Sequence, residues 1–130
     1  MSIVLDTCAL IWWSLDPARL SVIAKQTCEQ MEKDKNGLVS SISLWEIAIK
    51  LKNKKLDLGV DLATYLAALK RSDVIQIVPI DEDAWIESVA LEWAHRDPAD
   101  RVVVTLARSY QAVIVTSDKK ISNFYPEIAW

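Results

Sequence analysis

Four acidic residues stand where an ordinary surface acid is not expected. Asp6 directly follows the apolar run 3–5, and Asp118 closes a second apolar stretch at 112–116. Apolar runs without alternation are typical of strands buried on both faces of a parallel sheet, and such sheets bind ligands beyond the carboxyl ends of their strands. Glu46 is embedded in an apolar helical segment, and Asp100 begins another. If the two strands are neighbours, all four carboxylates could face one cavity.

Several carboxylates at one place indicate a particular chemistry. They cannot crowd together unpaired, because like charges and burial both oppose ionisation. A hard divalent cation such as Mg²⁺ or Mn²⁺ resolves the conflict, since it prefers oxygen ligands and keeps several waters. Such an ion polarises water and neutralises charge that develops on a phosphoryl oxygen. Because the chain has no glycine-rich nucleotide cradle, the pattern favours metal-dependent phosphodiester hydrolysis.

Each acid alone also has a simpler explanation. An Asp after a strand is often a turn residue or a helix cap, which taken singly is the better interpretation of Asp6. Asp100 suits the first turn of a helix, where the helix dipole favours an acid. Glu46 could pair with a lysine, and Asp118 could belong to an ordinary turn. The joint occurrence of all four is harder to explain in this way.

The rest of the chain predicts the elements that would position these acids. Pairs of helical segments separate the expected strands, an alternation typical of an α/β domain in which helices wrap a parallel sheet. The expected strands lie at 3–5, 38–42, 74–80 and 112–116, with one more possible at 127–129.

Two local patterns predict helix boundaries and faces. Asp16 and Pro17 suit the N-cap and the first position of a helix that runs to about residue 34. Trp85, Val89 and Trp93 recur at a spacing of four residues, which predicts the buried face of another helix.

Composition limits the class of protein. The 130 residues, 52% of them apolar, predict one domain spanning 1–130. No apolar run approaches the roughly 18 residues of a membrane span, and the amino terminus lacks a signal-peptide pattern, so we expect a cytoplasmic protein with Cys8 and Cys28 reduced. The net charge of −3 argues against binding nucleic acid through bulk positive charge, although a metal would reverse the local field of the acids. The single histidine, His95, is expected to be a loop residue and not a metal ligand.

Four short motifs occur in order along essentially the whole chain: Leu5-Asp6-Thr7, Trp45-Glu46-Ile47, Asp97-Pro98-Ala99-Asp100-Arg101 and Thr116-Ser117-Asp118. Together they resemble the PIN-domain ribonucleases, and more closely the VapC-type toxins of type II toxin–antitoxin pairs. Each motif is weak alone, but the ordered set is specific. The resemblance implies a three-layer α/β/α domain with a small, mainly parallel sheet. It also implies an endoribonuclease that uses Mg²⁺ or Mn²⁺ to cleave RNA, with tRNA or rRNA expected as the target and translation inhibited as a result.

The resemblance assigns roles to the acids. Asp6 and Asp100 would be the most direct metal ligands. Glu46 and Asp118 would bind a second metal or orient metal-bound water. Asp97 could compete for the third position, but Asp100 is preferred because the third acid of the family opens the apolar helix.

The neighbours of the acids have supporting roles or depart from the family pattern. Thr7 and Thr116 stand where the family often has a hydroxyl, so they could hold the site by hydrogen bonds. Arg101 could pair with a site carboxylate or contact a phosphate. Cys8 occupies a position that is often His, and Ala99 one that is often aromatic, which could alter packing near the site.

Basic residues and tryptophans suggest contacts with partners. A solvated helix end is slightly favoured for the lysines after Glu46, and the alternative is a basic rim that holds RNA phosphates. The candidate RNA-binding residues are Lys50, Lys52, Lys54 and Lys119. Adjacent Trp12 and Trp13 cannot both be buried on one narrow stripe, so one could lie in an interface. The resemblance implies a homodimer and a cognate antitoxin whose peptide covers the active-site groove.

Three other functions are open to a chain of this pattern. The main alternative is a non-catalytic interaction module of the same fold, which the presence of all four acids argues against. A haloacid-dehalogenase-type phosphatase needs a second Asp two residues after the first, where this chain has Cys8. A flap-type DNA nuclease generally has more acids and extra DNA-binding elements, for which the chain has little room.

Overall fold

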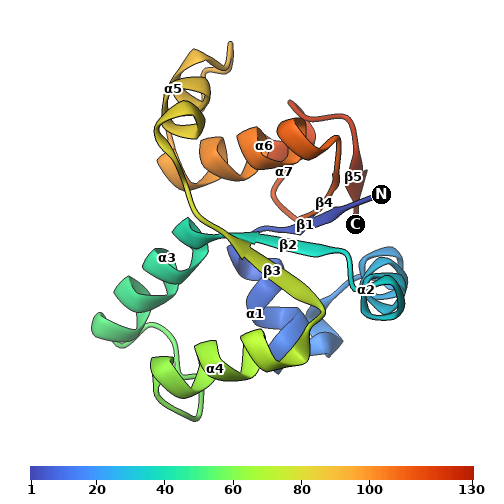
Figure 1. Cartoon of the computed structure of the whole chain (residues 1–130), viewed down its shortest axis with the longest axis vertical. Helices are drawn as coiled ribbons and strands as arrows, with labels where there is room; N and C mark the ends of the chain where they lie inside the picture. Colours follow the sequence, from blue (N-terminus) through green and yellow to red (C-terminus); the bar gives the residue numbers. More distant parts are fainter.

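Short apolar runs form a five-stranded parallel sheet in the computed structural model, which describes residues 1–130 (Figure 1). The order across the sheet is β3-β2-β1-β4-β5, so the first strand lies at the centre, and β1 and β4 pair in parallel with Leu5 opposite Val115. This arrangement confirms the predicted α/β class and makes the two acid-terminated strands neighbours. The strands are β1 (Ile3–Leu5), β2 (Gly37–Ser40), β3 (Ile75–Val78), β4 (Val113–Val115) and β5 (Ile128–Ala129).

Helices cover both faces of the sheet, which gives the three layers expected (Figure 1). One face carries α1 (Thr7–Leu15), α2 (Val22–Asp34), α3 (Ser41–Lys52) and α4 (Leu62–Ser72). The other carries α6 (Pro98–Tyr110) and α7 (Lys119–Ser122), with α5 (Glu82–Ala90) packed on α6. None of these helices combines the length and the apolar character that crossing a membrane requires.

The central strand shows why an unbroken apolar run is needed. Ile3 and Leu5 belong to the hydrophobic cluster under α1 to α4, whereas Val4 belongs to the cluster under α6 and α7. All three are buried, because successive side chains of a strand point to opposite faces and both faces here are covered. A polar residue can therefore enter β1 only at its end, where Asp6 stands.

The second helix begins later than predicted. Pro17 starts only a 3₁₀ turn, Pro17–Arg19, after which Leu20 adopts an extended conformation and is buried in the core. Ser21 then caps α2, and its hydroxyl accepts a hydrogen bond from the Ala24 N–H at 3.0 Å. The anchoring of Leu20 in the core separates the two segments that the sequence pattern joined.

The buried helix face predicted from Trp85, Val89 and Trp93 is wrong. Trp85 is 45% exposed and Val89 is 79% exposed, while α5 ends at Ala90, before Trp93. Trp93 lies in the following loop and stacks on Phe124 with ring centroids 4.6 Å apart. Hydrogen bonds from Arg101 to the carbonyls of Ser88 and Val89 attach the end of α5 to α6.

Both adjacent tryptophans of α1 have partners within the chain. Trp12 lies 5.7 Å from Trp130 between ring centroids, and the Arg19 guanidinium lies over its ring. Trp13 donates a hydrogen bond from Nε1 to Glu32 at 2.9 Å. Both side chains remain half-buried.

Candidate active site

Asp6 stands where β1 turns into α1. It is the N-cap of α1, and its Oδ1 accepts a hydrogen bond from the Ala9 N–H at 2.8 Å. Its other oxygen, Oδ2, accepts a hydrogen bond from the buried hydroxyl of Thr116. The residue is only 8% exposed. The helix-cap interpretation is therefore correct for one oxygen, while the second is held by a neighbouring strand.

Asp118 follows the parallel neighbour of β1. Thr116 comes directly after β4, and its hydroxyl oxygen accepts the Asp118 N–H at 3.0 Å while the hydroxyl donates to Asp6. Asp118 caps α7 by accepting the Lys120 N–H at 2.9 Å. One buried threonine thus ties the two strand-terminal acids together, which is the hydrogen-bonding role expected for a hydroxyl here.

Glu46 approaches from the middle of α3. Thr7, at the start of α1, hydrogen-bonds Glu46 Oε1 and also contacts the buried Ser43 hydroxyl at 2.9 Å. These contacts fix one carboxylate oxygen and leave Oε2 without a protein partner. Glu46 therefore has a hydroxyl partner and not the lysine that the simpler explanation would require.

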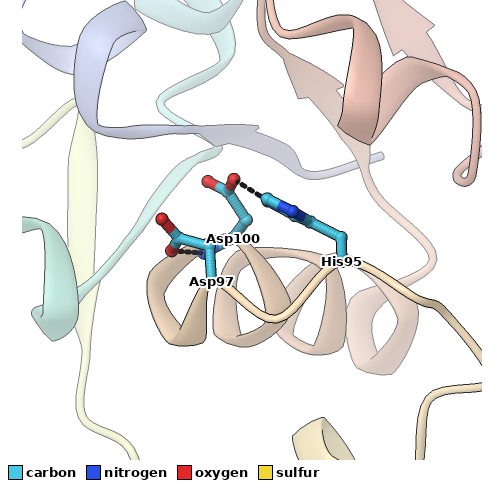
Figure 2. Close-up of side chains that lie close together, drawn as sticks. All are labelled: His95, Asp97 and Asp100. Atoms are coloured by element: carbon cyan, nitrogen blue, oxygen red, sulfur yellow. Dashed lines mark hydrogen bonds and ion pairs between the residues drawn. The ribbon is translucent and has the colours of Figure 1, made fainter.

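Asp100 lies in the first turn of α6, with His95 and Asp97 beside it (Figure 2). Asp97 caps the helix by accepting the Asp100 N–H at 3.1 Å. His95 Nε2 lies 2.6 Å from Asp100 Oδ2. One potential ligand atom from each of the three residues lies within 4.8 Å of the others. Asp6, Glu46 and Asp118 are not members of this tight cluster.

His95 is the residue that the sequence analysis missed. It does lie in a loop, as expected, but its side chain is half-buried against a site carboxylate. The available signal was its position five residues before Asp100, as the only histidine of the chain.

Arg101 does not take the position expected from the sequence. Its guanidinium forms no ion pair with a carboxylate and donates five hydrogen bonds of 2.6–3.2 Å to backbone carbonyls at the end of α5 and in the loop beyond it. All of its side-chain donors are thereby engaged, so none is free for a phosphate or an acid. The five acceptors are Ser88, Val89, Leu91, Trp93 and His95.

The pKa values of Asp6 and Asp100 are both raised. Burial raises the pKa of Asp6 from 3.8 to about 6, against the lowering effect of the Thr116 and Ala9 hydrogen bonds, and the charges of Asp100 and Asp118 raise it further. Burial also raises the pKa of Asp100, with Asp97 and Asp118 adding to the effect and the His95 hydrogen bond opposing it. The negative charge therefore converges at the carboxyl edge of β1 and β4.

The donor set fits a hard divalent cation. The chain has two ion pairs, Lys35–Asp73 and His95–Asp100. Neither joins a lysine or an arginine to any of the four acids. Carboxylate oxygens that lack a cationic partner are the ligands that Mg²⁺ and Mn²⁺ prefer. Burial raises the pKa of both Asp6 and Asp100, a penalty on the ionised carboxylates that a bound cation would relieve.

The predicted basic residues form no ion pair with the four acids. Lys50 is half-buried at the end of α3 and lines a hollow of about 520 Å³ that includes Cys8 and Trp12. Lys52 and Lys54 are exposed further along. Lys119 is exposed at the start of α7, directly after Asp118.

The parallel sheet, its helical layers and the acids at its edge define a PIN-type domain, and the chain belongs to the PIN domain family, whose family model matches residues 3–125. Among curated proteins it is similar to Ribonuclease VapC22 of Mycobacterium tuberculosis (strain ATCC 25618 / H37Rv). The two are 28% identical over 123 residues, which cover 94% of this chain and 91% of the relative.

Solved structures share the fold at lower identity. A toxin–antitoxin complex from Klebsiella pneumoniae matches with a TM-score of 0.65 and 22% identity, over 98% of this chain and 95% of that one. FitAcB from Neisseria gonorrhoeae gives 0.62 and 19%, over 92% and 89%. PAE2754 from Pyrobaculum aerophilum gives 0.57 and 15%, over 98% and 83%.

Proposed function

We propose that this protein is a metal-dependent endoribonuclease that acts as the toxin of a toxin–antitoxin pair. Its substrates would be tRNA or rRNA in the cytoplasm, and their cleavage would inhibit translation. The observation that carries the proposal is the convergence of Asp6, Asp100 and Asp118 at one sheet edge without a lysine or arginine partner. Membership of the PIN family and the similarity to a protein named as a ribonuclease support it.

The side chains present suit the division of roles expected from the sequence. Mg²⁺ or Mn²⁺ held by Asp6 and Asp100 would supply a polarised water and neutralise charge on a phosphoryl oxygen. Asp118 and Glu46 would bind a second ion or orient the attacking water. Thr116 donates a hydrogen bond to Asp6, and Thr7 donates one to Glu46. Both carboxylates are therefore already oriented before substrate binds.

RNA would approach along the end of α3. The hollow that includes Cys8, two residues after Asp6, is flanked by Arg19, Lys50 and Lys55, and its wall also includes Trp12, Asp16 and Asp57. Phosphates beside the scissile bond can meet these cations while the acids face the bond itself. We propose that the exposed Lys52, Lys54 and Lys119 also contact the RNA.

An apolar surface between α3 and α5 suits a second copy of the chain. Trp45 is 61% exposed, and together with Trp85 it lines a hollow that also includes Ile42, Ile80 and Pro98. Exposed aromatic side chains grouped in this way usually mark an interface. We propose that this surface forms a homodimer, while the cognate antitoxin covers the acidic edge. Sedimentation of Trp85→Glu as a monomer, beside a dimeric parent, would support the assignment, and an unchanged dimer would contradict it.

RNA cleavage tests the proposed function. The purified chain, freed of any antitoxin, is incubated with total tRNA and rRNA in Mg²⁺, Mn²⁺ or chelator. Asp6→Ala and Asp100→Asn should abolish the discrete fragments that the parent produces with metal. Asp73→Asn is the matched control, because Asp73 is an exposed acid paired with Lys35 before β3 and should not matter. Absence of both cleavage and Mn²⁺ binding would instead favour a non-catalytic interaction module.

A further inference from the structure

The side chain of His95 is held by several contacts, although the residue lies in a loop. Its imidazole is half-buried, and Nε2 lies 2.6 Å from Asp100 Oδ2, as Figure 2 shows. The contact engages one oxygen of a proposed metal ligand and leaves Oδ1 for a cation. Outer partners of this kind orient ligands in many metal sites.

An aromatic row holds the imidazole from one side. The ring of His95 packs against Trp93 with centroids 4.9 Å apart, and Trp93 stacks on Phe124 at 4.6 Å with the rings nearly parallel. Phe124 follows α7, the helix that Asp118 caps. The row thus connects the loop before Asp100 with the segment after Asp118, and it restricts how far His95 can move from its acid.

Arg101 holds the same loop through its backbone. Its Nη1 donates to the carbonyl oxygens of Trp93 and His95, each at 2.8 Å, while its other nitrogens bind carbonyls of residues 88–91. Arg101 directly follows Asp100 in α6. The proposed metal ligand Asp100 and the arginine that binds the loop carrying His95 therefore lie in the same helical turn. A fork of five donors can hold a loop in this way, whereas a single ammonium cannot.

We infer that His95 is a positioning residue, which donates from Nε2 to Asp100 so that the remaining carboxylate oxygen faces the metal, and that Arg101 and Trp93 hold it there. The inference rests on the proposed metal site. It assigns His95 no contact with the metal or the RNA.

Two substitutions separate the hydrogen bond from the packing. His95→Phe keeps a ring on Trp93 but removes the donor. His95→Gln replaces the ring by an amide whose N–H₂ reaches about as far as Nε2. We expect His95→Phe to bind Mn²⁺ at least about tenfold more weakly in calorimetry, with an unchanged circular dichroism spectrum. His95→Gln should recover most of the affinity, and excess Mn²⁺ should restore cleavage to His95→Phe but not to Asp100→Asn.

Because His95 is the only histidine, a long-range ¹H–¹⁵N spectrum shows one imidazole. The inference predicts a protonated Nε2 both without and with Mg²⁺. An unprotonated Nε2 that shifts on Mg²⁺ addition would mean direct ligation and would overturn it, as would parental Mn²⁺ affinity in His95→Phe. If the parent chain itself bound no Mn²⁺, both the proposed function and this inference would fail. Direct ligation by Nε2, or parental Mn²⁺ affinity in His95→Phe, would overturn only the inference and leave the proposed function intact.

Discussion

Replacing Asp6 by Asn is expected to stabilise the metal-free protein, although it removes a proposed metal ligand. The pKa of Asp6 rises from 3.8 to about 6 in the folded state, mainly because the carboxyl is buried. Keeping it ionised at neutral pH therefore lowers the free energy of unfolding by about 3 kcal/mol. The Asn side-chain oxygen can still accept the hydrogen bond from the Ala9 N–H. Its amide nitrogen cannot accept the hydrogen bond from Thr116, and the loss of that bond lowers the free energy of unfolding of the variant by about 1 kcal/mol. The expected net gain is about 2 kcal/mol.

The gain should depend on pH in a defined direction. Folded Asp6 keeps its proton up to about pH 6, whereas the unfolded residue loses it near 3.8. The folded state therefore binds more protons between these values, and the stabilisation from the raised pKa is complete below 3.8 and lost as pH rises through 6. The advantage of Asp6→Asn should be small near the lower limit and full at neutral pH.

Urea unfolding in chelator measures this difference through the six tryptophans. The parent and Asp6→Asn are compared across the pH window, with Asp73→Asn as the exposed-acid control. Mn²⁺ should then raise the free energy of unfolding of the parent but not that of Asp6→Asn. A metal-free Asp6→Asn that is less stable than the parent at neutral pH would refute the reasoning, because it would mean that the buried charge is already compensated within the protein.

Two substitutions at other contacts and the pH dependence of cleavage give three further predictions. Arg101→Lys should lower the free energy of unfolding by about 2 kcal/mol or more, because carbonyls around α5 lose their donors, and it should shift the His95 imidazole resonance; an unchanged urea midpoint would contradict this. Thr7→Val should lower stability by about 1 kcal/mol and slow RNA cleavage, since Glu46 loses its hydroxyl partner; a parental rate would show that this bond does not matter. The cleavage rate at limiting Mn²⁺ should fall as pH drops through about 6, where Asp6 takes up a proton, and excess Mn²⁺ should move the fall to lower pH; a fall that ignores metal concentration would exclude Asp6 as its source.

The strands and the acids that end them were predictable because both faces of the sheet are covered. Covered strands need unbroken apolar runs, so the end of a run marks the sheet edge, and the two runs that end in Asp6 and Asp118 do form the neighbouring strands β1 and β4. Glu46 was noticeable because it interrupts an apolar helical segment, and Thr7 hydrogen-bonds to it in the structure.

Residues whose partners are backbone groups or distant rings were not predictable. An arginine next to an acid in the sequence suggests a cation that pairs with a carboxylate or a phosphate of the site. Every residue has a backbone carbonyl, so the sequence does not reveal that Arg101 binds five of them. The spacing of Trp85 and Val89 shows that one side of a helix is apolar, and it cannot tell whether that side is covered within the chain. The sequence predicts a loop position for His95, and a single histidine in a loop carries no signal for hydrogen bonding to a neighbouring carboxylate.

Anomalous diffraction from crystals soaked in Mn²⁺ would test most directly whether the acidic edge is a metal site. The prediction is a peak about 2 Å from carboxylate oxygens of both Asp6 and Asp100, with His95 Nε2 outside bonding distance of the ion. A peak held by His95 and Asp97 without Asp6, or no peak from a preparation that cleaves RNA with Mn²⁺, would contradict the proposed site.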